Sequence, residues 1–262
     1  MSDVLVVKFG GAAFTKAADF SAIAELIIKL QARCPRIAVV VSAMANMTDH
    51  LLSLAMEVNP LPPKREQDML VSVGERISMA LLAMALAAKG VKAVSFTGSQ
   101  SGIITSTEHS DAKIIDVKPA RILQELTKGH IVIVAGFQGV SQSKEITTLG
   151  RGGSDTTAVA LGIALEASQV IFYKDVLGIY LHDPKKNVET TPISHLQYNE
   201  ALAIVQGGAK ILHKRSLLLA KKNQIPLLVT CFHEQATQGF SGTLIREDGQ
   251  RDFLSKLYED VE

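Results

Sequence analysis

The chain has 262 residues, of which 47% are hydrophobic and 20% charged, so it can bury a sizeable core and does not have the composition of a disordered protein. Its 27 basic and 26 acidic residues give a formal charge of +1, which offers no indication of a nucleic-acid or membrane-surface partner. Two cysteines exclude a disulfide scaffold and a four-cysteine zinc site, and without a signal-peptide pattern at the start we expect a cytoplasmic protein.

Short runs rich in Val and Ile alternate along the chain with longer helical patterns. Such runs are typical of strands that are buried on both faces of a parallel sheet. We expect these strands at residues 4–9, 37–41, 91–96, 131–135, 170–173 and 227–231. The alternation predicts an α/β fold, a three-layer αβα sandwich with a mainly parallel central sheet.

Helical spacing of apolar residues marks the intervening segments. We expect helices over residues 20–30, from Thr48 or Asp49 to about 57, and over residues 65–89, 154–167 and 209–223. The most apolar stretch, residues 77–88, is too short to span a bilayer and is better explained as part of a buried helix. In folds of this kind, ligands bind at the carboxyl ends of the strands.

The first predicted strand ends in Lys8, Phe9, Gly10 and Gly11. A glycine pair lets the backbone turn sharply and direct N–H groups at an anion, and the lysine adds a point charge. The pattern is neither a Walker A loop nor a Gly-x-Gly-x-x-Gly fingerprint. Taken alone, it is explained as well by a tight turn at the end of a strand.

A stronger signal lies at residues 147–157, Thr-Thr-Leu-Gly-Arg-Gly-Gly-Ser-Asp-Thr-Thr. Its glycines expose backbone N–H groups where a helix begins, and that end of a helix attracts anions. Arg151 offers a planar fork that suits a carboxylate. Ser154 and Asp155 are good helix caps, but capping does not explain an arginine among glycines, so we favour a binding site here over a plain loop.

Two further segments are compatible with a nucleotide. The segment that follows the strand at 170–173 carries Lys174, Asp175 and Tyr180, and a solvated turn explains it equally well. Lys210 falls in the first turn of the helix expected at 209–223, where a cation is unfavourable unless an anion offsets it. A surface lysine is nevertheless the commoner case.

Gly74 and Glu75 interrupt the apolar pattern of the long helix. Gly74 costs about 1 kcal/mol of helix propensity relative to Ala, so it suggests close approach by a ligand or another backbone. Glu75 could bind an ammonium group or simply pair with a nearby Lys or Arg. The seven histidines form no His-x-x-x-His or Cys/His cluster, and we predict no metal site made by the protein.

Together these motifs resemble the catalytic domain of the aspartokinases, in the amino acid kinase superfamily. Residues 147–158 are the most specific part, and residues 42–44 with 48–49, 68–75, 132–140 and 239–245 are also similar. The resemblance implies the amino acid kinase (carbamate kinase-like) fold over residues 1–245, with a substrate half at roughly 1–165 and a nucleotide half at roughly 166–245. It leaves residues 246–262 as a short tail without regulatory ACT domains, so we expect activity that is indifferent to lysine and threonine.

The resemblance implies transfer of the γ-phosphoryl group of ATP to the β-carboxylate of L-aspartate. The products are 4-phospho-L-aspartate and ADP, in the first step toward lysine, threonine and methionine. The partners would be L-aspartate and MgATP, with Mg²⁺ held mainly by the phosphates, and the chain would form a homodimer. Neither nucleic acid nor membrane is expected.

The same resemblance assigns roles to individual residues. Lys8, Gly10 and Gly11 would steady the transferring phosphoryl group. Arg151 would bind the α-carboxylate of aspartate and Glu75 its α-ammonium group. The remaining assignments are a substrate pocket completed by Ser42 and Thr48, an Asp155 that organises the catalytic lysines with Ser154 beside it, and a nucleotide site with Lys174, Asp175, Tyr180, Lys185, Lys210 and Ile211.

Four residues depart from the family pattern. Ala12 and Ala13 replace a Thr-Ser pair, Lys174 replaces a Thr, Lys185 an Arg, and Lys214 a Pro. Most of the site matches, so we expect a working kinase. One alternative is a non-catalytic amino-acid or nucleotide sensor, which Ala12 and Ala13 favour. The other is a kinase of the same superfamily that acts on another amino acid.

Overall fold

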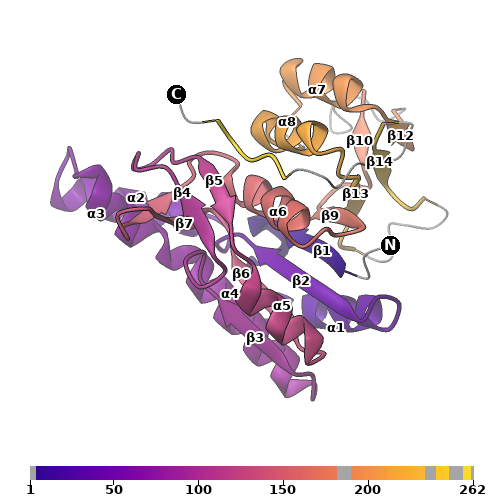
Figure 1. Ribbon diagram of the computed structural model, residues 1–262, viewed down its shortest axis with the longest axis horizontal. Coiled ribbons are helices and arrows are strands. Elements are labelled where there is room, and N and C mark those ends of the chain that lie inside the picture. The colour runs from indigo at the N-terminus through magenta and orange to yellow at the C-terminus, as the bar shows by residue number, and fades with distance from the viewer. Residues whose placement is uncertain (1–3, 182–189, 210, 234–239, 248–255, 261–262) are drawn as a thin grey trace.

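A large, mainly parallel sheet forms the centre of the computed structural model (Figure 1). The structure describes residues 4–181, 190–209, 211–233, 240–247 and 256–260. Within these ranges the sheet has the strand order β12-β14-β13-β9-β1-β2-β6-β3, and the strands from β13 to β3 run parallel. The bounds are β1 (Val4–Phe9), β2 (Arg36–Val41), β3 (Ala93–Phe96), β6 (Ile131–Ala135), β9 (Gln169–Lys174), β12 (His195–Leu196), β13 (Leu227–Cys231) and β14 (Thr243–Ile245). These six strands from β13 to β3 are the ones that the sequence predicts, and β12 and β14 add a further parallel pair at one edge.

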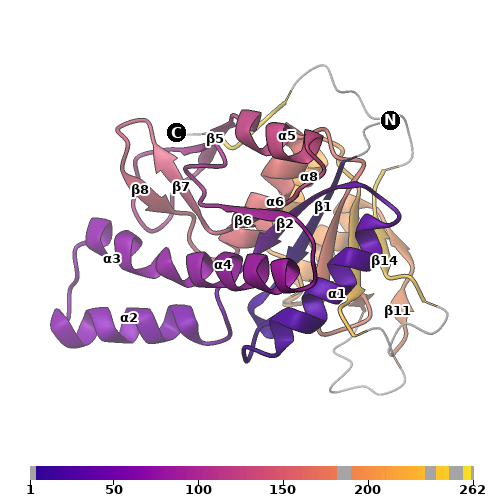
Figure 2. The ribbon, with the colours of Figure 1, turned by 90° about the horizontal axis from the view of Figure 1, so that it is seen from below.

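Helices cover both faces of this sheet. One face carries α1 (Asp19–Gln31) and α4 (Val73–Ala88), and the other carries α5 (Ala120–Thr127), α6 (Gly153–Ala164), α7 (Tyr198–Gln206) and α8 (Lys214–Lys222). Figure 2 shows α1 and α4 on the near side of the sheet, with α5, α6 and α8 behind it. The predicted three-layer α/β fold is therefore confirmed.

The two faces have separate hydrophobic cores, because alternate residues of each strand point in opposite directions. In β1, Val4 and Val6 belong to the core that includes α6, whereas Val7 and Phe9 belong to the core beneath α1 and α4. Burial on both sides explains why these strands are continuous apolar runs rather than alternating ones.

Two helices extend beyond the edge of the sheet. They are α2 (Met47–Val58) and α3 (Lys64–Val71), and α3 meets α4 at Ser72 (Figure 2). The sequence predicts one helix over 65–89. At the break, the side-chain amide of Gln138 donates a hydrogen bond to the Ser72 carbonyl at 2.8 Å, a contact between residues 66 positions apart.

The helical segment 64–88 is longer than the apolar run at 77–88 that stands out in the sequence. Its mean hydropathy reaches 1.6, so by length and composition alone it could cross a membrane. A core helix of a globular protein meets the same criterion. Here α4 packs against β3, β6 and α1.

A second sheet flanks the first, and the sequence analysis missed it. Its strands lie in the order β5-β4-β7-β8, with bounds β4 (Ile103–Thr105), β5 (Ile114–Val117), β7 (Gln138–Ser141) and β8 (Ile146–Thr148). Strands this short give too few alternations to be recognised. The sequence also missed α5, α7 and the small pair β10 (Ile179–Tyr180) and β11 (Pro192–Ile193).

Two predicted helix boundaries need correction. The helix expected over 154–167 is α6, which ends at Ala164. The helix expected over 209–223 is α8, which begins only at Lys214 because His213 has an extended backbone at φ −84°, ψ 139°. The prediction for Lys210 rested on a helix that begins at 209, and Lys210 itself lies outside the described residues.

Candidate active site

Two lysines reach the same face of the central sheet from adjacent strands. Lys8 lies two residues after Val6 on β1, and Lys174 lies two residues after Phe172 on β9. Val6 and Phe172 both face the core that includes α6, so the two lysines continue toward that helix. The carboxylate of Asp155, in the first turn of α6, meets both Nζ atoms. Its Oδ1 is 2.6 Å from Lys8 and its Oδ2 is 3.5 Å from Lys174.

This cluster is almost completely shielded from water. Burial alone would raise the pKa of the Asp155 carboxyl, but the charges of Lys174 and Lys8 outweigh it and lower that pKa to about 2. Burial also lowers the pKa of Lys174, although the Asp155 carboxylate opposes the shift. Asp155 is thus an ionised counter-charge that fixes the positions of two amines at the carboxyl ends of β1 and β9.

The glycine pair after β1 forms a tight turn, as predicted. A short 3-10 helix, η1 (Gly11–Ala13), begins directly after Gly10. A Cβ on Gly11 would lie 2.9 Å from the carbonyl oxygen of Ala43, so a side chain there would force the two loops apart. Ala12 is exposed and lines the pocket described below, whereas Ala13 is buried.

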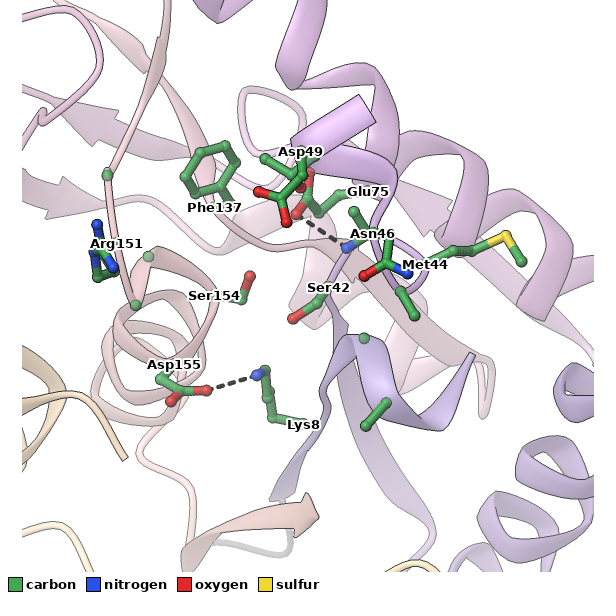
Figure 3. A pocket seen from close by; sticks show the side chains of 18 residues that line it. Lys8, Ser42, Met44, Asn46, Asp49, Glu75, Phe137, Arg151, Ser154 and Asp155 are labelled. Carbon is green, nitrogen blue, oxygen red and sulfur yellow. Dashed lines mark hydrogen bonds and ion pairs between the residues drawn. The ribbon is translucent and has the colours of Figure 1, made fainter. Parts of the chain in front are cut away.

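A pocket opens above this turn, between the end of β1 and the start of α6 (Figure 3). Its volume of about 380 Å³ is at the small end of the range for small-molecule sites, roughly 300–1,000 Å³. The residues that line it are Lys8, Gly11, Ala12, Ser42, Ala43, Met44, Ala45, Asn46, Thr48, Asp49, Glu75, Phe137, Gly150, Arg151, Gly152, Gly153, Ser154 and Asp155. They include the residues predicted from the sequence to act in catalysis or to bind the substrate, namely Lys8, Ser42, Thr48, Glu75, Arg151, Ser154 and Asp155.

Glu75 brings a buried carboxylate to this pocket from α4. One of its oxygens, Oε1, accepts a hydrogen bond from the Ala43 N–H at 3.0 Å, while Oε2 is buried with no hydrogen-bond partner among the described residues. Burial raises the pKa of Glu75 to about 7, against smaller opposing effects of that N–H and of Lys8. Gly74 allows this approach, because a Cβ there would lie 2.8 Å from the Cβ of Ala43.

Arg151 stands at the opposite side of the pocket from Asn46 and Met44 (Figure 3). It lies between Gly150 and Gly152, both of which have left-handed backbones, with φ of 68° and 76°. The turn therefore presents an exposed guanidinium at the mouth of the pocket, directly before the N-terminus of α6. A cationic fork beside a helix N-terminus is a suitable site for a carboxylate.

The residues predicted to bind nucleotide are only partly gathered. Lys174 contacts Asp155. Gly10 lies close to the Lys8 side chain, because a Cβ added to Gly10 would be 3.6 Å from the Lys8 Nζ. Asp175 is exposed, Tyr180 is half-buried, and Ile211 packs against the core that includes α6; none of the three lines the pocket. Lys185 and Lys210 lie outside the described residues.

Several pocket residues were given no role by the sequence analysis. Asn46 and Phe137 have left-handed backbones, with φ of 63° and 67°, which is uncommon outside glycine. The sequence signal for Asn46 was an asparagine two residues before Thr48, close to the start of a predicted helix. Asp49 was named as a possible helix cap and as part of the family pattern, but was given no role in the site. Among the described residues, no group of three or more His, Cys, Asp and Glu is placed to hold a metal ion.

The sequence matches the amino acid kinase family over residues 3–231. It is 48% identical over 227 residues to an aspartokinase from Mycolicibacterium smegmatis, a match that covers 86% of this chain and 54% of that protein. The chain thus spans about half the length of this relative.

Solved structures show the same likeness. Aspartate kinase from Synechocystis superposes with a TM-score of 0.83 at 36% identity, over 95% of this chain and 40% of that one. E. coli aspartokinase III, solved in complex with aspartate and ADP, gives a TM-score of 0.83 at 26% identity, over 94% of this chain and 65% of that one.

Proposed function

This chain belongs to the amino acid kinase family, and we propose that it is an aspartate kinase. In this proposal it transfers the γ-phosphoryl group of ATP to the β-carboxylate of L-aspartate and releases ADP and 4-phospho-L-aspartate. The likeness to aspartokinases from several bacteria supports the choice of acceptor.

One observation carries the proposal: the pocket offers complementary charges for each part of an amino acid with an acidic side chain. Arg151 suits the α-carboxylate, and the unpartnered Oε2 of Glu75 suits the α-ammonium group. The lysines held by Asp155 lie beside the same pocket, where the β-carboxylate would meet a phosphoryl group. Ser42, Thr48 and Ser154 complete its walls with hydroxyl groups.

The chemistry needs positioning and positive charge rather than a base. A β-carboxylate is already ionised at neutral pH, so its oxygen attacks the γ-phosphorus without losing a proton. A phosphorus–oxygen bond forms to the carboxylate as the bond to the β,γ-bridging oxygen breaks, and that oxygen leaves with ADP. Lys8 stabilises the charge on the transferring group. Asp155, with its pKa lowered to about 2, keeps the lysines in place and does not accept a proton.

The remaining assignments belong to the same proposal. MgATP is a substrate whose phosphates hold the magnesium ion, and it binds toward the half of the chain after about residue 166. Lys174, Asp175, Tyr180 and Ile211 lie in that half, as do Lys185 and Lys210. We also propose a cytoplasmic homodimer that serves lysine, threonine and methionine synthesis.

A non-catalytic sensor is the second candidate, and one observation favours it. Ala12 presents a methyl group to the pocket where the family pattern has a hydroxyl. A sensor would bind aspartate or nucleotide at the same groups and transfer nothing.

Coupled ADP release tests the proposal. The purified chain is incubated with MgATP and, in turn, L-aspartate, L-glutamate, L-asparagine, N-acetyl-L-glutamate, or no acceptor. We expect ADP release that depends on L-aspartate and saturates with it. Release with another acid instead would identify a different kinase of this family, whereas aspartate binding without release would identify a sensor.

A further inference from the structure

Arg215, in the first turn of α8, donates hydrogen bonds to two backbone carbonyls beside the start of the loop that carries Arg151. Its Nη1 donates to the carbonyl of Leu149 at 2.6 Å, and its Nη2 donates to the carbonyl of Ala112 at 2.5 Å. Leu149 lies two residues before Arg151, and the Ala112 N–H donates to the Thr148 carbonyl at 2.9 Å. Both carbonyls therefore belong to backbone that sets where the loop begins.

The start of α8 touches the same loop a second time. Gly152 lies against the ring of His213, so closely that a Cβ on Gly152 would be 2.2 Å from the ring carbon Cγ. The loop at 149–153 is thus held at Leu149 by a hydrogen bond from Arg215 and at Gly152 by contact with His213. Its position depends on where α8 places these two side chains.

The C-terminal segment 256–260 completes the network through Glu259. The Glu259 carboxylate accepts hydrogen bonds from both Nε and Nη2 of Arg215, the latter at 2.6 Å. It also accepts one from the Ile114 N–H at 2.7 Å, and the Glu259 N–H donates to the Ile114 carbonyl at 3.0 Å. One side chain of the tail thereby joins α8 to β5.

The Arg215–Glu259 pair is well shielded, with side chains 18% and 11% exposed. A two-point arginine–carboxylate pair fixes the orientation of the guanidinium as well as its charge. Without Glu259, the partners left to Arg215 among the described residues would be two neutral carbonyls and the exposed carboxylate of Asp111 at 3.6 Å. It would then be free to turn away from Leu149.

We propose that Arg215 and Glu259 are positioning residues for the loop at 149–153, and that docking of segment 256–260 sets the affinity for the amino-acid substrate. A chain segment or protein that displaced 256–260 would release Arg215, loosen the loop and weaken substrate binding. It would leave the lysine–aspartate cluster at Asp155 unchanged. The consequence for aspartate rests on the proposed function, whereas the coupling between tail and loop does not.

Hydrogen–deuterium exchange on the full chain tests the coupling without any assay of activity. In Glu259→Ala we expect faster exchange of the amides at 149–153, with unchanged exchange in β1 and β2. Asp260→Asn is the matched control. Asp260 belongs to the same segment but pairs with Lys222 at the surface, where its side chain is 91% exposed, so exchange should match wild type.

Steady-state kinetics then test the consequence. We expect Glu259→Ala to raise the KM for L-aspartate about five- to thirtyfold, with kcat and the KM for ATP changed less than twofold. Glu259→Gln keeps an acceptor for Arg215 and should give a smaller rise in KM. It also serves as the test variant if Glu259→Ala does not fold.

Two outcomes would overturn the proposal. One is a folded Glu259 variant with wild-type exchange at 149–153. The other is faster exchange spread equally over β1 and β2, which would give the pair a merely structural role. If wild type itself does not phosphorylate aspartate, the proposed function fails, and the exchange experiment still decides the coupling.

Discussion

The pocket has a buried carboxylate at each end, and the two lie in opposite electrostatic surroundings. Asp155 is held between two lysines, and their charges lower its pKa to about 2. Glu75 accepts one backbone hydrogen bond and has no cation at hydrogen-bonding distance among the described residues, so burial raises its pKa to about 7. The described residues supply two cations to Asp155 and no hydrogen-bond partner to Oε2 of Glu75.

The two ends of the pocket therefore differ in whether their charges are compensated before a substrate binds. The Asp155 end is preorganised, because its charges are compensated before any substrate arrives. The Glu75 end is incomplete, and a ligand ammonium group would supply the missing counter-charge. Opposite pKa shifts in one pocket are a recognised way to find groups with different roles.

The largest effect should come from removing a cation at the Asp155 end. Lys8→Met should lower kcat by about a hundredfold or more, with little change in either KM, because its charge matters most during transfer. Steady-state kinetics with L-aspartate and ATP measure this. Lys16→Met, which removes an exposed lysine from the loop after β1, should behave as wild type. Near wild-type turnover in the Lys8 variant would show that the charge of Lys8 does not contribute to transfer and that this residue only ends the strand.

The two carboxylates should respond oppositely when each loses its charge. Asp155→Asn leaves two buried lysines without their counter-charge and should lower the free energy of unfolding by about 3 kcal/mol. Glu75→Gln removes an unpaired buried charge and should raise it by about 1–2 kcal/mol at pH 8. Urea unfolding at pH 8 measures both. Changes of the same sign would show that the two environments are alike.

The pH dependence of these contributions also differs in sign. The lowered pKa of Asp155 gives a stabilising contribution that is present above its unfolded pKa, near 4, and is lost as pH falls toward 2. The raised pKa of Glu75 means that the folded state binds this proton more tightly, so its destabilising effect grows from about pH 4.5 to 7. The gain from Glu75→Gln should therefore shrink as pH falls from 8 to 5.

Arg151 tests the substrate side of the pocket. Arg151→Ala should weaken L-aspartate binding roughly ten- to hundredfold, the size expected for a lost charge-assisted contact of about 1.5–3 kcal/mol. ADP affinity should not change, and titration calorimetry can measure both. Arg33→Ala removes an exposed arginine elsewhere and is the control. An unchanged affinity for L-aspartate in Arg151→Ala would show that Arg151 does not bind this substrate.

Glu75 should also control how substrate capture depends on pH. Its ionised form is the one that attracts an ammonium group, so kcat/KM for L-aspartate should rise with pH and level off above about pH 7. Between pH 5.5 and 6.5 the expected change is up to about tenfold. In Glu75→Gln, a low and nearly flat profile is expected. If kcat/KM rises with pH to the same extent in wild type and in Glu75→Gln, the rise reports the ionisation of a group other than Glu75.

The smallest effect concerns Ala12. A Thr at this position would place a hydroxyl in the pocket beside Lys8, and Ala12→Thr should leave kcat unchanged or raise it by a few-fold. Ala13→Ser is a less informative change, because Ala13 is buried and does not line the pocket. Loss of activity in Ala12→Thr would show that the turn after β1 binds phosphate in another way.

The sequence predicted the parts of this site that depend on local order along the chain. Lys8 at the end of an apolar strand and Arg151 among glycines could both be recognised, because a strand end and a helix start are local signals. Contacts between distant segments could not. The bond from Ala43 to Glu75 spans 32 residues, and Lys174 meets Asp155 only because α6 packs against both β1 and β9.

Arg215 and Glu259 show the same limit more strongly. They lie 44 residues apart, and neither belongs to a motif that distinguishes it from other surface charges. The four-stranded sheet was missed for a related reason, since its strands are defined by their partners rather than by their own pattern.

Trapping the acyl phosphate with hydroxylamine tests the proposed transfer most directly. When the wild-type chain is incubated with MgATP, L-aspartate and hydroxylamine, aspartate β-hydroxamate should form in step with ADP. Lys8→Met should lower both products together by about a hundredfold or more. Release of ADP without hydroxamate, or no hydroxamate at saturating L-aspartate, would show that this pocket does not phosphorylate a β-carboxylate.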